Sequence, residues 1–231
     1  MPDEPNTNRA HVLQMMWLHT WGLSVIVYFA VFAYALFFFG RFDAKAIGEA
    51  FAGTAAILIG FSFALSGFCY YFDFLDQKLF YRKFLGLVGF WYACGYVASL
   101  IIRSPERYLW GLGQTVKQPE AILGIAAMII FAFMAAISNH QAMQRLGCGR
   151  WRQALRLGYL AYISLIVRAL LIEGQDWVQW ISHPRALPSP RLLVTIFAIF
   201  VLALRASMII MESSQLKRAG VGKDLQNGKV C

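Results

Sequence analysis

The stretch AILGIAAMIIFAFMAAISN, residues 121–139, decides the fold, because it carries no charged side chain over its whole length. A helix needs about 20 mostly apolar residues to cross the hydrocarbon core of a bilayer. Six such segments run approximately over residues 14–39, 51–73, 84–102, 121–139, 157–173 and 192–211. The sequence therefore predicts an all-α fold, a polytopic membrane bundle of about six transmembrane helices.

The composition supports this prediction. Of the 231 residues, 59% are hydrophobic and 14% are charged, whereas a soluble domain has about 45–50% apolar and about 25% charged residues. The formal charge of +9 comes from Lys and Arg in short runs between the apolar segments. Basic residues in such places orient a membrane protein, so nucleic acid is not expected as a partner.

The basic residues also predict which side of the membrane each loop occupies. Twelve Lys and Arg residues lie in the tails and loops on the side of the two termini, and seven lie in the loops on the other side. Because Lys and Arg are retained on the cytoplasmic side, both termini are predicted to be cytoplasmic. The predicted domains are a cytoplasmic tail at 1–13, a six-helix transmembrane domain at 14–211 and a basic cytoplasmic tail at 212–231.

Two loops on the outer side, 103–120 and 174–191, are longer than a hairpin needs. The second contains Trp177 and Trp180 ahead of three prolines, and tryptophan beside polar residues at a helix end is typical of the membrane interface. We expect both loops to form short amphipathic pieces that lie on the outer surface and anchor the protein. A lid over a site, or a docking surface for a partner, is the alternative.

Ionisable residues inside a span are costly and mark candidate sites. Arg168 and Arg205 are such residues, although snorkelling or pairing with a neighbour also explains them. Two facing imidazoles can hold a b-type heme in a helical bundle. His19 and His140 are predicted to lie in the same leaflet and could face each other, although an interfacial histidine bonded to water or backbone is the commoner situation.

Motifs of soluble catalytic sites do not occur in the chain. There is no Walker loop, no GxGxxG after a strand, no GxSxG elbow and no HExxH. The four cysteines are scattered without metal-ligand spacing. No metal site is therefore expected, and the sequence favours a role other than that of an enzyme.

Two runs in the middle of the chain resemble a known family. They are YRKFLGLVGFWYA at 81–93 and RLGCGRWRQALRLGYLA at 145–161. The first resembles the opening of the third helix, and the second the stretch leading into the fifth helix, of the ferric-reductase-like transmembrane domain family. The resemblance is in particular to the heme-binding membrane subunit of the bacterial methionine-sulfoxide reductase system. It implies six helices with both ends inside, in a bacterial cytoplasmic (inner) membrane, and a link to electron transport.

The positions at which that family holds heme carry other residues here. The histidine three residues after the Tyr92-Ala93 pair is replaced by Tyr96, and two histidines of the fifth helix are replaced by Leu155 and Arg168. Leucine cannot ligate iron, and a permanently charged guanidinium is a poor donor. Tyrosinate can ligate heme iron, but one tyrosine does not make the family's site. The resemblance therefore implies a scaffold that has lost heme ligation, with no cofactor expected.

Small residues predict where helices approach each other closely. Gly86 and Gly89 are three residues apart and share one face of the third segment. Glycine at such spacing lets two membrane helices pack backbone to backbone. We therefore expect this face to be a packing seam in a bundle that contacts membrane lipids and other membrane subunits.

Three functions are compatible with these features. The first is a non-catalytic membrane subunit, a scaffold that packs in a larger membrane complex. The second is a transmembrane electron-transfer subunit whose heme or quinone site uses relocated residues, with His19, His140, Tyr96 and Arg168 as candidates. The third is a transporter that uses Arg168 and Arg205 for an anionic substrate.

Overall fold

The computed structural model describes residues 4–71, 81–111, 113, 117–138, 144, 148–183 and 187–218, and every regular element within them is a helix. The elements are α1 (Glu4–Phe39), α2 (Ala44–Tyr71), α3 (Tyr81–Arg103), the short π-helix η2 (Glu106–Trp110), α5 (Pro119–Ile137), α7 (Cys148–Ser182) and α8 (Pro190–Arg218). All except η2 are long and apolar enough to cross a membrane. The predicted all-α bundle of about six spans is confirmed.

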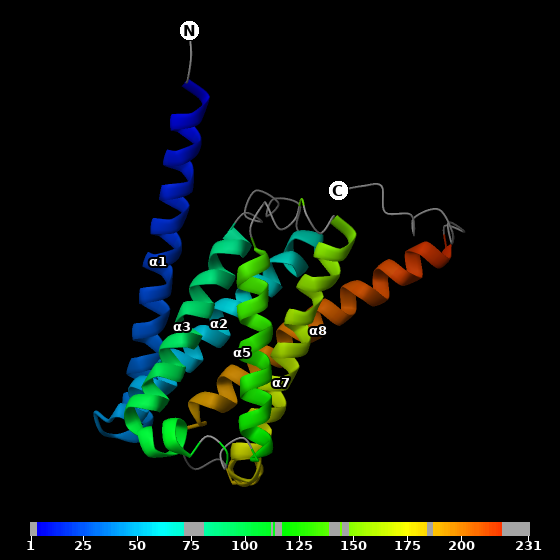
Figure 1. Ribbon diagram of the computed structural model, residues 1–231. Coiled ribbons are helices and arrows are strands. Elements are labelled where there is room, and N and C mark those ends of the chain that lie inside the picture. Colours follow the sequence, from blue (N-terminus) through cyan, green and yellow to red (C-terminus); the bar gives the residue numbers. More distant parts are fainter. Residues whose placement is uncertain are drawn as a thin grey trace.

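The six long helices run back and forth between two ends of the bundle (Figure 1). The described part of α1 begins toward the top of this view, and the described part of α8 ends toward the same end of the molecule. We call this the near end of the bundle and the opposite one the far end. The ends of α1, α3 and α7 and the starts of α2, α5 and α8 lie at the far end.

Helix α2 is the centre of the bundle. It contacts α1, α3 and α8, and 67% of its spanning window is buried, against 11% to 22% for the other five spans. Helices α5 and α7 pack against each other. Helix α1 has the smallest buried share and lies at the edge of the bundle, where its first turns extend beyond the other helices (Figure 1).

The main core lies where α2, α5, α7 and α8 meet. Its buried residues are Ile59, Phe63, Ala64, Ala127, Phe131, Ala161, Tyr162, Ala198 and Val201. The hydroxyl of Tyr162, a residue only 1% exposed, donates a hydrogen bond of 2.8 Å to the carbonyl oxygen of Ala56. Because a buried hydroxyl needs a partner, this bond satisfies the tyrosine and ties α7 to α2.

The glycines at 86 and 89 lie on the face of α3 that packs against α2. A Cβ atom on Gly89 would lie 2.8 Å from Cγ1 of Ile59 and 3.2 Å from its backbone nitrogen. A Cβ atom on Gly86 would lie 3.2 Å from the hydroxyl oxygen of Ser62. The two helices therefore approach each other more closely here than a larger residue would allow, and the approach is tighter at Gly89.

Helix α7 does not end where the sequence predicts. It continues to Ser182, so the expectation of a separate surface piece is wrong for residues 174–182. Gly174 is the only helix-weakening residue in this stretch, and one glycine costs about 1 kcal/mol in a helix. Trp177, expected at the outer surface, is 5% exposed and lies within the bundle.

The other long loop and the two ends of the chain also differ in detail from the predicted boundaries. Helix η2 forms a short helical piece in the loop 103–120 and leaves Trp110 86% exposed; its position on the membrane surface stays a prediction. Helix α1 already begins at Glu4 and α8 continues to Arg218. Both helices therefore extend into the stretches predicted to be tails.

Candidate functional site

Two cavities of similar size open between the helices, one toward each end of the bundle. The far cavity has a volume of about 450 Å³ and lies between α2, α3, α5, α7 and α8. The near cavity has a volume of about 460 Å³ and lies between α2, α3, α5 and α7. Ile59 and Phe131 line both cavities and separate them. Both volumes fall within the range of about 300–1,000 Å³ that is usual for ligand pockets.

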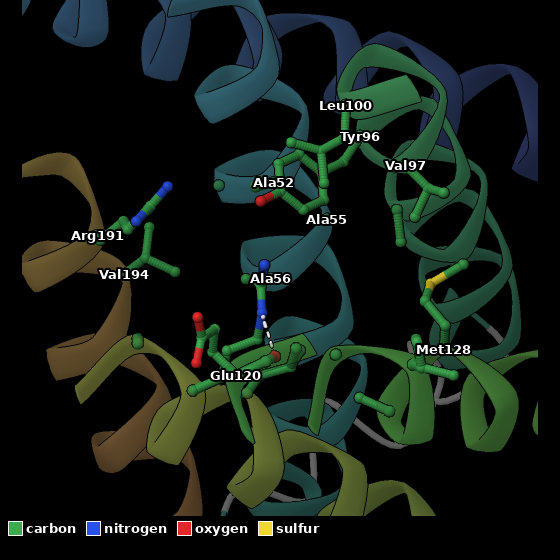
Figure 2. A pocket seen from close by; sticks show the side chains of 18 of the residues that line it. Ala52, Ala55, Ala56, Tyr96, Val97, Leu100, Glu120, Met128, Arg191 and Val194 are labelled. Carbon is green, nitrogen blue, oxygen red and sulfur yellow. Dashed lines mark hydrogen bonds between the residues drawn. The ribbon is translucent and has the colours of Figure 1, made fainter. Parts of the chain in front are cut away.

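Small side chains on α2 create the far cavity. Apart from Glu49 and Ile59, α2 contributes only alanines and a glycine to its wall, at positions 52, 53, 55 and 56. Figure 2 shows Arg191 and Val194 of α8 on one side of these alanines and Met128 of α5 on the other. The wall is therefore mostly apolar, with charged groups where the helices reach the far end.

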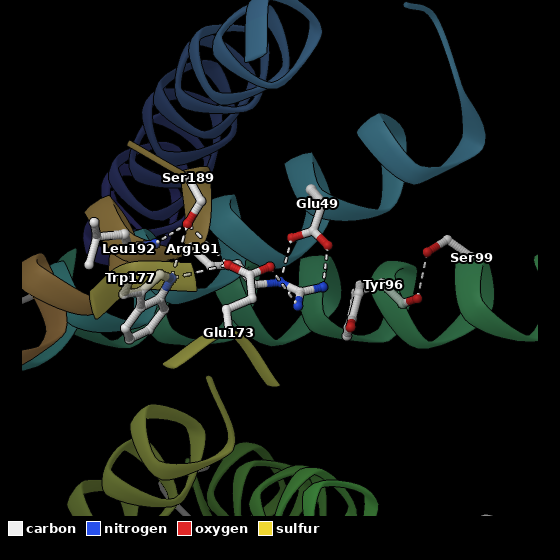
Figure 3. Close-up of polar contacts among 8 residues, drawn as sticks. All are labelled: Glu49, Tyr96, Ser99, Glu173, Trp177, Ser189, Arg191 and Leu192. Atoms are coloured by element: carbon white, nitrogen blue, oxygen red, sulfur yellow. Dashed lines mark hydrogen bonds and ion pairs between the residues drawn. The ribbon is translucent and has the colours of Figure 1, made fainter. Parts of the chain in front are cut away.

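Three charged residues form a cluster at this end that joins three helices (Figure 3). Both guanidinium edges of Arg191 on α8 are engaged. Its Nε donates to Oε2 of Glu49 on α2 at 2.9 Å, and a second nitrogen donates to Oε1 of the same carboxylate. A third contact, 3.0 Å long, pairs Arg191 with Oε1 of Glu173 on α7. The bidentate geometry is the strong form of this interaction.

The remaining oxygen of Glu173 connects this ion triad to the start of α8. Oε2 of Glu173 accepts hydrogen bonds from Nε1 of Trp177 at 3.2 Å and from Oγ of Ser189 at 3.0 Å. Ser189 in turn accepts the backbone N–H of Leu192 at 3.2 Å. Ser189 is thus the N-cap of α8, followed by Pro190 at the first helical position, where proline is favoured.

Arg168 and Tyr96 meet at the far cavity. The Nε of Arg168 donates to the backbone carbonyl of Glu120 at 3.0 Å, and its guanidinium lies 5.9 Å from the centre of the Tyr96 ring. Gly124 leaves the space for this arrangement, because a Cβ there would lie 3.1 Å from Nε of Arg168. Within the described part of the chain, Arg168 forms no ion pair with a carboxylate.

The other predicted site residues are not brought together. His19 is exposed on α1 and lines neither cavity, as far as the structure describes their walls. His140 lies outside the described residues. Leu155 lines the near cavity. Arg205 contacts the ring of Tyr159, with its guanidinium 5.5 Å from the ring centre, on the near half of the bundle, so it shares no site with Arg168.

Sequence reasoning missed the ion triad. Glu49 and Arg191 lie just before the predicted starts of their spans, at 51 and 192, so they counted as loop charges. The sequence did contain a signal for them: a charged residue within one turn of a membrane span is costly and needs a partner. Glu49 and Arg191 have opposite charge and lie at the far ends of different segments, so they could have been expected to pair. A hydropathy profile does not show which charged residues pair.

Part of the chain is similar to curated proteins. No family model matches the chain. The chain is, however, similar to heme-binding subunits of bacterial protein-methionine-sulfoxide reductases, which confirms the resemblance seen in the sequence.

Two particular relatives carry this similarity. The chain is 32% identical over 92 residues, 39% of its length, to the protein-methionine-sulfoxide reductase heme-binding subunit MsrQ of Agrobacterium fabrum. It is 29% identical over 97 residues, 41% of its length, to the subunit of the same name from Rhodospirillum rubrum. The matches cover 42% and 46% of those proteins, so the chain spans less than half the length of the curated relatives that it matches.

The name of these relatives implies heme. Whether the two cavities of this chain could hold a heme depends on the side chains that line them and could bind iron. Among the described lining residues, the far cavity offers the phenols of Tyr96, Tyr108 and Tyr162 and the thioether of Met128, and the near cavity offers the thioether of Met134. None of these described residues is a histidine. The fixed charge of Arg168 beside Tyr96 also disfavours a second cationic centre there. The described residues therefore do not fit a heme held by two imidazoles.

Proposed function

We propose that this chain is a non-catalytic integral membrane subunit, a ferric-reductase-like scaffold that has lost heme ligation and packs in a larger membrane complex. The observation that carries the proposal is the contact between Arg168 and Tyr96. Two positions at which the family would hold histidine carry, instead, a guanidinium and a phenol that interact with each other, and the guanidinium also donates to the Glu120 carbonyl. The third position, Leu155, has no donor atom.

The proposal also assigns the partners of the chain. The relatives are named as subunits, which supports a place in a complex. Helix α1 is the least buried span and exposes large apolar side chains, among them Leu18, Ile26 and Phe29. Lipids and neighbouring membrane subunits are the surroundings in which such a surface is stable.

We further propose that both termini are cytoplasmic, in a bacterial cytoplasmic membrane, because the loops at the near end carry the excess of Lys and Arg. Green fluorescent protein fused after Arg218 is expected to fluoresce, and alkaline phosphatase fused there is expected to be inactive. Alkaline phosphatase fused at Gly113, in a far-end loop, is expected to be active. The opposite pattern of activities would reverse the orientation.

An absorption spectrum tests the loss of heme ligation. The chain, purified in mild detergent together with whatever co-purifies, is expected to show no Soret band, either oxidised or after reduction with dithionite, and to carry a stoichiometric protein partner. A Soret band with reducible α and β bands, lost in His19→Ala or His140→Ala, would contradict this. It would instead support an electron-transfer subunit with relocated ligands.

A gain of heme would test the same proposal from the other direction. The double variant Tyr96→His with Arg168→His restores imidazoles at two facing positions of the far cavity and is expected to acquire a Soret band. Tyr96→Phe with Arg168→Gln is the matched control, since it removes the same two side chains without adding a donor. If the histidine variant folds and binds no heme, the far cavity is not a former heme site and the proposal fails.

A further inference from the structure

The near cavity combines apolar walls with two basic side chains. Aromatic and aliphatic residues make most of its surface, namely Phe63, Phe90, Phe131, Met134, Trp151 and Leu155. Arg82 and Lys83, in the first turn of α3, line it at the near end of the bundle, together with the hydroxyls of Ser62 and Ser138. No carboxylate is found among the described residues that line it. The cavity is thus amphipathic, and its polar part is cationic.

The charge of this cavity is not balanced by the described part of the chain. Neither Arg82 nor Lys83 forms an ion pair there. Arg205 on α8 lies close enough to Arg82 for the two like charges to interact unfavourably, and its own contacts, the ring of Tyr159 and Sδ of Met208, are uncharged. Several cations near apolar walls repel each other more strongly than they would in water. An anion bound between them would relieve this repulsion.

Local hydrogen bonds hold the walls of the cavity in place. The hydroxyl of Ser62 donates to the backbone carbonyl of Arg82 at 2.7 Å, which fixes the first turn of α3 against α2. The indole nitrogen of Trp151 donates to the carbonyl of Ile137 at 3.1 Å, which fixes the start of α7 at the end of α5. The basic residues and the apolar wall are therefore positioned by contacts that need no ligand.

We propose that the near cavity binds the phosphate headgroup of an anionic phospholipid, with Arg82 and Lys83 at the phosphate and the first part of an acyl chain against the apolar wall. Basic pockets between transmembrane helices on the cytoplasmic side suit anionic headgroups, and tryptophan at this depth is typical of the lipid interface. A cavity of about 460 Å³ takes a headgroup and the start of a chain, not a whole lipid. The site goes beyond the scaffold role and does not depend on it.

Lipid retention tests this site. The chain is placed in nanodiscs of phosphatidylcholine with a minor share of phosphatidylglycerol, and the lipids that stay bound after detergent extraction are identified by native mass spectrometry. We expect one phosphatidylglycerol per chain, retained in preference to phosphatidylcholine. Arg82→Gln and Lys83→Gln are each expected to weaken its binding roughly fivefold, as the loss of one basic residue at a lipid headgroup predicts.

Two features of the chain make the test decisive. Arg156→Gln removes the same charge from an exposed side chain of α7 that does not line the cavity, and it is expected to leave retention unchanged. Lys83 is exposed, so Lys83→Gln leaves the core intact and tests the site even if Arg82→Gln does not assemble. Equal retention in all three variants would overturn the proposal.

Free phosphate is the other possible source of the same chemistry. Inorganic phosphate and glycerol phosphate carry the headgroup charge without an acyl chain, so neither is expected to displace the bound phosphatidylglycerol at millimolar concentration. Displacement by either one would show that the site takes a soluble anion, and the lipid assignment would then be wrong. This readout uses no absorption spectrum, so its failure and the failure of the scaffold proposal are distinguishable.

Discussion

Replacing Arg191 with Ala is expected to lower the free energy of unfolding by about 3 to 5 kcal/mol, the usual cost of removing one partner of a buried ion pair. The side chains of Glu49 and Glu173 are only 8% and 21% exposed. Without the guanidinium, the two carboxylates would lose the cation that pairs with both of them. The measurement is the midpoint of thermal unfolding in detergent, followed by intrinsic tryptophan fluorescence.

A second ion pair of this chain provides the matched control. Arg41 lies 3.9 Å from Asp43, and its side chain is 77% exposed. Exposed pairs of this kind contribute little, because water screens them, so Arg41→Ala is expected to leave the midpoint nearly unchanged. Arg191→Lys should fall between the two, because an ammonium keeps the charge but cannot form the bidentate contact with Glu49. Equal midpoints for Arg191→Ala and Arg41→Ala would show that the triad does not stabilise the fold.

Gly89→Leu is expected to prevent normal packing of α3 on α2, at a cost of about 3 kcal/mol or more, the upper range for overpacking a core. The first added atom would already lie 2.8 Å from Cγ1 of Ile59 and 3.3 Å from the carbonyl oxygen of Ala55. The side chain of Ile59 can rotate, but the backbone of α2 cannot move without shifting a central helix. The measurement is the yield of monodisperse protein on size exclusion together with its thermal midpoint.

Ala98→Leu is the control for this substitution, because Ala98 is exposed on the same helix. It adds similar bulk toward the surroundings, so yield and midpoint are expected to stay close to those of the unaltered chain. Gly86→Ala should have a smaller effect than Gly89→Leu, since its Cβ would meet only the side chain of Ser62, at 3.2 Å, and not the backbone of α2. If Gly89→Leu and Ala98→Leu behave alike, the seam between α2 and α3 is not a close helix contact.

The two cavities separate Leu155 from Arg168, two of the three positions that the family resemblance singles out. Leu155 and Arg168 are thirteen residues apart on α7, which corresponds to about 20 Å along a helix. That rise places one of them in the near cavity and the other in the far cavity. The far cavity carries the ion triad at its rim, and the near cavity carries cations without a carboxylate among its described lining residues.

Sequence alone was sufficient for the number, order and approximate limits of the spans. Hydropathy over about 20 residues is a local property, and the thickness of the bilayer sets the length, so no tertiary contact is needed to read it. Sequence also drew attention to Tyr96, Leu155 and Arg168, through the resemblance of the runs at 81–93 and 145–161; that these residues replace heme ligands stays a prediction. It failed at helix ends, as in α7, where the helix continues through the polar stretch 173–176 to Ser182.

Only the packing of the helices in the tertiary structure showed which polar residues contact each other. Glu49 and Arg191 are 142 residues apart, and Trp177, which the sequence placed at the membrane interface, is buried and donates to Ser189 at the start of α8. Such pairings depend on the rotation and depth of each helix relative to its neighbours. Those quantities are set by small residues on α2 and by the close approach at Gly89, and a hydropathy pattern contains neither of them.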